Sequence, residues 1–85
     1  MDEIDLDTCG LLCPLPVLKA RKRLMALAPG AVLVVRATDR ASILDMPHFC
    51  AGAGHEYLGL SEDGAVLVHR IRRGALSDQP GSDPA

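Results

Sequence analysis

The spacing of hydrophobic and polar residues predicts four strands separated by two helical regions. Ile4 and Leu6 alternate with Asp5 and Asp7, a period of two that is typical of a half-buried strand running into a turn at Cys9-Gly10. The continuous apolar run 31–35 is typical of a strand at the centre of a sheet. Segments 57–60 and 65–71 flank Ser61-Glu62-Asp63-Gly64, whose Asp-Gly step predicts an antiparallel hairpin.

The period changes to that of an amphipathic helix from Leu15 onward, and Pro29-Gly30 is expected to end this helix. Arg21 is the one charged residue on the predicted apolar side. That side consists of Val17, Leu18, Leu24, Met25 and Ala28. A second helical piece is expected within 38–46, where Pro47 should break or restart it. A further short helix through Phe49 and Cys50 is expected to close near Gly52 or Gly54.

This order of elements predicts an α/β fold, a two-layer α/β sandwich with the order β-α-β-α-β-β. The expected sheet is four-stranded and mixed, with two helices on one face. A chain of 85 residues has room for one core, which we assign to a single domain over 1–74. The remaining segment 75–85 is rich in Pro, Gly, Ser and Asp, and we predict that this tail is disordered.

Composition and charge argue against nucleic-acid and membrane partners. Tyr57 and Phe49 are the only aromatic residues, so base stacking has little to use, and a net charge of -2 gives no overall attraction to nucleic acid or acidic lipid. No apolar run approaches the length of a membrane span, and the acidic start MDEIDLD is unlike a signal peptide. We therefore expect a cytoplasmic protein.

Cys13 is the strongest candidate for chemistry because it stands where a loop meets the first helix, in the run Cys13-Pro14-Leu15-Pro16. If Pro14 is the first helical residue, Cys13 is the N-cap, and the positive end of the helix dipole should lower its pKa below about 8.5. Pro14 and Pro16 support the helix N-terminus but remove two N–H donors, which limits this effect. A thiolate here could act as a nucleophile or carry sulfur as a persulfide. A small buried hydrophobic residue is the alternative.

The other two cysteines are expected to be structural. Three cysteines are an odd number, so a disulfide framework is not expected in a reducing compartment. Cys9 could form a redox pair with Cys13, although C-x-x-x-C is not the usual redox spacing. Cys50 is a candidate secondary thiol.

The remaining polar candidates have less specific patterns. A zinc site from Cys13, His48, Cys50 and His55 is not expected, because their spacings match no ordinary zinc motif. His69 alternates with apolar neighbours and is predicted to point to solvent. Asp39 and Asp45 are expected to cap or hold the turns around the second helix.

Positive charge is concentrated on the first helix, close to Cys13 in the sequence. The residues are Lys19, Arg21, Lys22 and Arg23. They are candidates for docking an acidic surface of a partner protein, with an ordinary solvated helix face as the alternative.

The run Gly10-Leu11-Leu12-Cys13-Pro14-Leu15-Pro16 resembles the G-L-x-C-P-x-P signature of the TusA/SirA-like sulfur carrier (sulfurtransferase) family. The resemblance extends over 4–74 and has five further matching segments. These are Pro29-Gly30, Thr38-Asp39, Asp45-Met46-Pro47-x-Phe49-Cys50, Gly54-His55-Glu56 and Ile71-Arg72-Arg73-Gly74. It implies the sandwich fold predicted above and no metal or organic cofactor.

The resemblance also implies a function for Cys13. This residue would accept a sulfane sulfur as a persulfide from a cysteine desulfurase or a rhodanese-like donor. It would pass that sulfur to a downstream acceptor protein, in tRNA thiolation or in sulfur oxidation, as a covalent intermediate in a relay. Two other hypotheses remain at this point: a non-enzymatic regulatory or interaction module, and a thiol redox protein.

Overall fold

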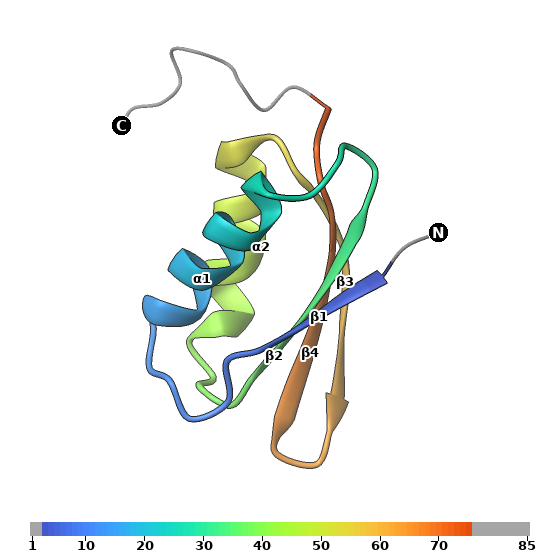
Figure 1. Ribbon diagram of the computed structural model, residues 1–85. Helices are drawn as coiled ribbons and strands as arrows, with labels where there is room; N and C mark the ends of the chain where they lie inside the picture. Colours follow the sequence, from blue (N-terminus) through green and yellow to red (C-terminus); the bar gives the residue numbers. More distant parts are fainter. Residues whose placement is uncertain (1–2, 76–85) are drawn as a thin grey trace.

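The computed structural model describes residues 3–75, which form four strands and two helices (Figure 1). In chain order the elements are β1 (Glu3–Asp7), α1 (Leu15–Met25), β2 (Val32–Ala37), α2 (Ser42–Ala53), β3 (Glu56–Asp63) and β4 (Val66–Arg72). The predicted disorder of the tail falls outside the described residues, except for Ala75.

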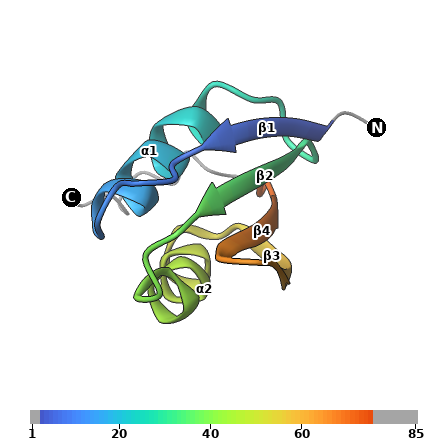
Figure 2. The same ribbon diagram turned by 90° about the horizontal axis from the view of Figure 1, so that it is seen from below.

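The strands form one mixed sheet in the order β1-β2-β4-β3. β1 is parallel to β2, whereas β4 is antiparallel to both β2 and β3. The predicted hairpin is confirmed, with Gly64 and Ala65 as its turn. Both helices lie on one face of the sheet, α1 beside β1 and β2 and α2 beside β4 and β3 (Figure 2). This arrangement is the two-layer α/β sandwich that the hydrophobic pattern predicts.

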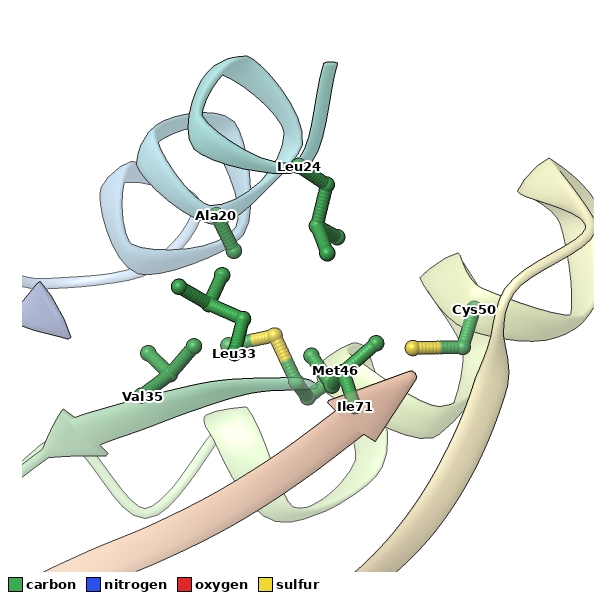
Figure 3. Packing of buried hydrophobic residues seen from close by; sticks show 7 residues of the cluster. All are labelled: Ala20, Leu24, Leu33, Val35, Met46, Cys50 and Ile71. Carbon is green, nitrogen blue, oxygen red and sulfur yellow. The ribbon is translucent and has the colours of Figure 1, made fainter. Parts of the chain in front are cut away.

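The core lies between the helices and the sheet and contains no aromatic residue among its fully buried members (Figure 3). Its buried residues are Ala20, Leu24, Leu33, Val35, Met46, Cys50 and Ile71. The strand residues in this cluster alternate along β2, which presents Leu33 and Val35 to the helices. The core is therefore aliphatic, as the composition predicts.

The opposite face of the sheet is covered by ion pairs between strands rather than by a second layer. Arg70 of β4 pairs with Glu3 of β1, two strands away, and so reaches across β2. Val34, on the strand beneath this pair, is only 6% exposed. Exposed pairs of this kind contribute little to stability, but their aliphatic stems shield the central strand from water.

The first helix is shorter than predicted, and only part of its predicted apolar side is buried, including Leu24. It ends at Met25, and Ala26 and Leu27 donate to carbonyls three residues back. Pro29 disfavours helical geometry at Ala28, which keeps that residue out of the helix. Pro16, Ala20 and Leu24 are buried, whereas Leu18 and Met25 are 50% and 66% exposed. The prediction that Leu18 and Met25 face the core is wrong.

Pro47 does not break the second helix, contrary to the sequence-based expectation. A single helix runs from Ser42 to Ala53 with Pro47 inside it, and Gly54 closes it with a left-handed φ of 82°. Proline inside a helix costs about 3 kcal/mol. Met46 and Cys50, one on each side of Pro47, are both buried against the sheet. The packing of these two turns holds the helix continuous.

His69 is fully buried, so the prediction that it points to solvent is wrong. Along β4 it shares the helix-facing side with Leu67 and Ile71. Its two ring nitrogens lie 2.9 Å from Ser42 Oγ and 2.8 Å from Tyr57 Oη. A buried imidazole is tolerated because both of its nitrogens have hydrogen-bond partners. The alternation of residues along the strand gives no sign of these partners.

The buried side of α1 can be tested with two leucines of the same helix. We expect Leu24→Ala to lower the free energy of unfolding by about 2–5 kcal/mol, because it opens a cavity in the core. Leu18→Ala should lower it by less than about 1 kcal/mol, because half of that side chain is in water. Urea unfolding followed by circular dichroism measures both. Equal losses would contradict the orientation of α1.

Candidate functional site

The loop that carries Cys13 is fixed to the end of β2 by hydrogen bonds. The Thr8 amide and hydroxyl both donate to the Arg36 carbonyl, at 2.8 and 2.6 Å. The Gly10 amide donates to Thr38 Oγ1 at 2.9 Å, and Gly10 has a φ of 88°, which favours glycine. The loop is thus held against the segment that leads from β2 to α2.

Asp39 makes the bond that places Cys13. The Cys13 amide donates to Asp39 Oδ2 at 2.7 Å, and the Ala41 amide donates to Oδ1 at 3.0 Å. One carboxylate therefore joins the loop before α1 to the turn before α2. The expectation that Asp39 holds this turn is correct, but its bond to Cys13 was not visible in the sequence.

The helix begins one residue later than the sequence suggests. Leu15 is the first helical residue, Pro14 is the N-cap, and Pro16 is the second helical residue. Both prolines therefore belong to the helix N-terminus, as predicted. Cys13 precedes the cap, so the prediction that it is the N-cap is wrong, and its amide points to Asp39 rather than into the helix.

The pKa of Cys13 is raised, not lowered. Partial burial is the largest cause, followed by the carboxylates of Asp45 and Asp39, which attract the thiol proton and repel a thiolate. Together these effects raise the pKa of Cys13 to about 11. The helix dipole acts mainly on its first turn, where two prolines have removed donors, and it is outweighed by two full negative charges.

The resting thiol is consequently protonated at neutral pH but remains reachable. Cys13 is half-buried at the surface, between the start of α1 and the start of α2. Sulfur chemistry here requires that the thiol first lose its proton. The site is therefore a protected thiol whose reactivity depends on the charge around it.

The other two cysteines differ sharply from Cys13 in exposure. All three thiols are free. Cys9 is exposed, and its closest charged neighbour is the Asp7 carboxylate, which raises the pKa of the Cys9 thiol. Cys50 is 1% exposed in the core, where burial raises its pKa to about 12. A role for Cys50 as a secondary thiol would therefore require the core around it to open.

The basic residues of α1 are all exposed, and three of them line a groove of about 300 Å³ beside β1. The lining residues are Leu6, Lys19, Lys22, Arg23 and Ala26. Arg21 is exposed but does not line this groove. The structure thus separates the predicted docking set into a groove-lining triplet and Arg21.

Exposed leucines surround the Cys13 segment, a feature that the sequence did not predict. Leu12 is 70% exposed, and Leu15 and Leu18 are 45% and 50% exposed on the outward side of α1. Leu44, beside Asp45 on α2, is 78% exposed. These four leucines are therefore candidate contacts for another protein.

Other features place no further chemistry near Cys13. Within residues 3–75 no three His, Cys, Asp or Glu side chains are grouped in a way that could hold a metal ion. A hollow of about 570 Å³ lies at the opposite end of the sheet, next to Gly30, His55 and Arg72. Neither helix is long and apolar enough to cross a membrane.

Comparison with known proteins identifies the family. A model described as Sulfurtransferase TusA matches residues 4–73. The chain belongs to the TusA family. It is 44% identical over 70 residues to the sulfur carrier protein TusA of Pseudomonas entomophila, covering 82% of this chain and 88% of that one. It is 45% identical over 69 residues to TusA of Allochromatium vinosum, covering 81% and 91%.

Two further relatives extend the comparison. YrkF of Bacillus subtilis is 44% identical over 71 residues, an alignment that covers 84% of this chain but 38% of YrkF. The chain therefore spans less than half the length of that relative. A crystal structure of a SirA-like protein from Desulfitobacterium hafniense superposes with a TM-score of 0.70 at 32% identity, covering 84% of this chain and 97% of that one. The TusA/SirA resemblance is confirmed.

The effect of the carboxylates on Cys13 can be measured in a Cys9→Ser background, which removes the exposed thiol. We expect Asp45→Asn to lower the Cys13 pKa from about 11, because it removes a negative charge beside the sulfur. The rate of alkylation by iodoacetamide at pH 8 should rise at least about fivefold, because the thiolate fraction grows tenfold per unit of pKa.

Asp63→Asn is the matched control, since it makes the same charge change on the hairpin at the other edge of the sheet. Its alkylation rate should stay within about twofold of the parent. A slower reaction in Asp45→Asn would mean that Asp45 helps to deprotonate Cys13 rather than opposing the thiolate.

Proposed function

We propose that the protein is a sulfur carrier that accepts a sulfane sulfur on Cys13 as a persulfide and relays it to an acceptor protein. The observation that carries the proposal is the placement of Cys13, a half-buried but reachable thiol on a loop fixed at both ends. Membership of the TusA family supports the carrier role. In this role the protein is a covalent intermediate between two partners.

Loading transfers one sulfur without net oxidation. The Cys13 thiolate attacks the terminal sulfur of a persulfide on the donor, the donor's S–S bond breaks, and the donor cysteine leaves as a thiolate. Unloading repeats the exchange, with an acceptor nucleophile attacking the terminal sulfur on Cys13. Cys13 is released as a thiolate and regains its proton. Both steps require only thiol exchange chemistry, so no metal or organic cofactor takes part.

The carboxylates of Asp39 and Asp45 keep the carrier inactive between partners. Together with the partial burial of the thiol, which is the larger cause, they raise the pKa of Cys13 to about 11 in the free protein, which slows reaction with adventitious oxidants and electrophiles. A partner that brings a cationic group to this rim neutralises the carboxylates and favours the thiolate. Reactivity then appears only in the docked complex.

The partners are a cysteine desulfurase or a rhodanese-like protein as donor and a downstream protein as acceptor. Exposed Leu15 and Leu18 supply apolar contact near Cys13, and the groove-lining triplet Lys19, Lys22 and Arg23 supplies positive charge. An acidic partner surface would meet this flank of α1. The free thiols suit a reducing compartment such as the cytoplasm. The relay ends in tRNA thiolation or in sulfur oxidation.

Two alternatives make different demands on the cysteines. A thiol redox protein would need Cys9 and Cys13 to pair, yet the Cys9 thiol is associated with Asp7 and the Cys13 thiol with Asp39 and Asp45. A regulatory module whose thiol is incidental would keep its partners after loss of Cys13. The carrier proposal requires that loss of Cys13 abolish sulfur transfer, even where the partners still bind.

Loading can be tested by mass spectrometry of the intact protein after incubation with a cysteine desulfurase and cysteine. We expect a mass gain of one sulfur atom that dithiothreitol removes. The gain should be absent from Cys13→Ala and unchanged in Cys9→Ser, the matched control with an exposed thiol removed. An adduct that persists in Cys13→Ala would remove the assignment of the site.

The docking role of the groove-lining triplet predicts a charge-dependent rate. We expect Lys19→Glu combined with Arg23→Glu to slow loading by about tenfold at low salt, because favourable steering becomes repulsion. The decrease should shrink as salt rises. The control is the single charge reversal Arg21→Glu on the same helix. Arg21 lies outside the groove, so this variant should have a smaller effect. An equal effect of Arg21→Glu would place docking on the whole helix.

A further inference from the structure

A hydrogen-bonded chain inside the molecule links the sheet to the start of α2. Ser42 Oγ lies 2.9 Å from His69 Nε2, and Tyr57 Oη lies 2.8 Å from His69 Nδ1. Ser42 and His69 are fully buried, and Tyr57 is half-buried. Sulfur transfer uses none of these groups directly, so their presence in a core that is otherwise aliphatic calls for an explanation.

The imidazole is suited to hold two hydroxyl groups at once. Burial lowers the pKa of His69, so the ring is neutral at neutral pH and has one donor and one acceptor nitrogen. Serine and tyrosine hydroxyls can each donate or accept, so either tautomer satisfies the whole chain. An aliphatic residue at position 69 would leave two hydroxyl groups without partners, which costs more than ordinary packing loss.

Ser42 is the first residue of α2, and the helix has no side-chain cap of its own. Its amide donates to the Asp39 carbonyl at 3.0 Å, while the Asp39 carboxylate holds the Cys13 amide. Asp45 lies one turn further along α2 and also faces the Cys13 thiol. The two acidic residues around Cys13 therefore stand three residues before and three residues after Ser42.

We propose that His69 is a positioning residue, which anchors the first turn of α2 to the sheet through Ser42 and thereby sets Asp39 and Asp45 around the Cys13 thiol. The anchor lies on the core side of the turn, and the carboxylates lie on the side of the thiol. Loss of the anchor leaves Cys13 and both carboxylates chemically intact but loosens their arrangement. Tyr57 supports the imidazole from β3.

The experiment compares Ser42→Ala and His69→Phe in the Cys9→Ser background, with the rate of Cys13 alkylation measured from pH 7 to pH 11. We expect both variants to lower the apparent pKa of Cys13 and to raise its alkylation rate at pH 8 at least about threefold, which corresponds to a decrease in pKa of about 0.5. Ser42→Ala removes only one hydroxyl group, so it keeps the test valid if His69→Phe does not fold.

Leu67→Ala is the control for a merely structural role. Leu67 is buried on the same side of β4, but its side chain has no polar group and so takes no part in the hydrogen-bonded chain. It should destabilise the protein without moving the Cys13 pKa. The proposal is overturned if Leu67→Ala changes the pKa as much as Ser42→Ala does, or if the pH profile of folded Ser42→Ala matches the parent.

A double-mutant cycle with Asp45→Asn adds a direct test of the route. If Ser42 acts through the carboxylates, Ser42→Ala should change the Cys13 pKa less in the Asp45→Asn protein than in the parent. Equal changes in both backgrounds would exclude this route. The inference rests on Cys13 as the proposed sulfur-bearing residue, but alkylation needs no sulfur donor, so its failure and a failure of persulfide loading are distinguishable.

Discussion

The hydrogen bond between the Cys13 amide and the Asp39 carboxylate is the interaction on which the site depends. It joins two loops separated by 26 residues in the sequence and leaves the second carboxylate oxygen for the Ala41 amide. A neutral acceptor could orient the same amides, but a carboxylate makes stronger bonds to backbone N–H groups. Its charge has an unavoidable second effect, because it stands beside the thiol that it positions. The carboxylate that orders the loop therefore also adds to the rise in the Cys13 pKa, whose largest cause is the burial of the thiol.

This coupling explains how a carrier can hold a weakly acidic cysteine. An enzyme that reacts with small molecules gains from a thiolate that is always present, whereas a carrier gains from reacting only with its partners. The charges of this molecule are separated accordingly: Asp39 and Asp45 lie at the thiol, and the groove-lining triplet of α1 lies on the flank toward β1. In the carrier role proposed above, this separation lets a docked partner favour the thiolate at one place and bind at another.

The sequence was sufficient for the architecture because the signals were local. Alternation in β1, the apolar run of β2 and the Asp-Gly turn each depend on a few neighbouring residues, and each was confirmed. Cys13 and its prolines pointed to the candidate site in the sequence. The shift of the Cys13 pKa, however, was predicted with the wrong sign. Asp39 and Asp45 approach Cys13 only because β2 and α2 pack beside the loop, and no local pattern reports that approach. The burial of His69 and the outward side of Leu18 were missed for the same reason.

The second helix shows how core packing reaches the surface chemistry. Ser42, Met46 and Cys50 recur every four residues and face the sheet, while Asp45 sits on the neighbouring side of the same turn and faces Cys13. Pro47 removes one backbone donor from this helix, and the burial of Met46 and Cys50 against the sheet holds the turns on either side of it. In the positioning role proposed for His69, a change on the buried side of this helix reaches its exposed side through Ser42. On this proposal, the position of the carboxylates beside the thiol depends on the interior of the protein, although the thiol itself lies at its surface.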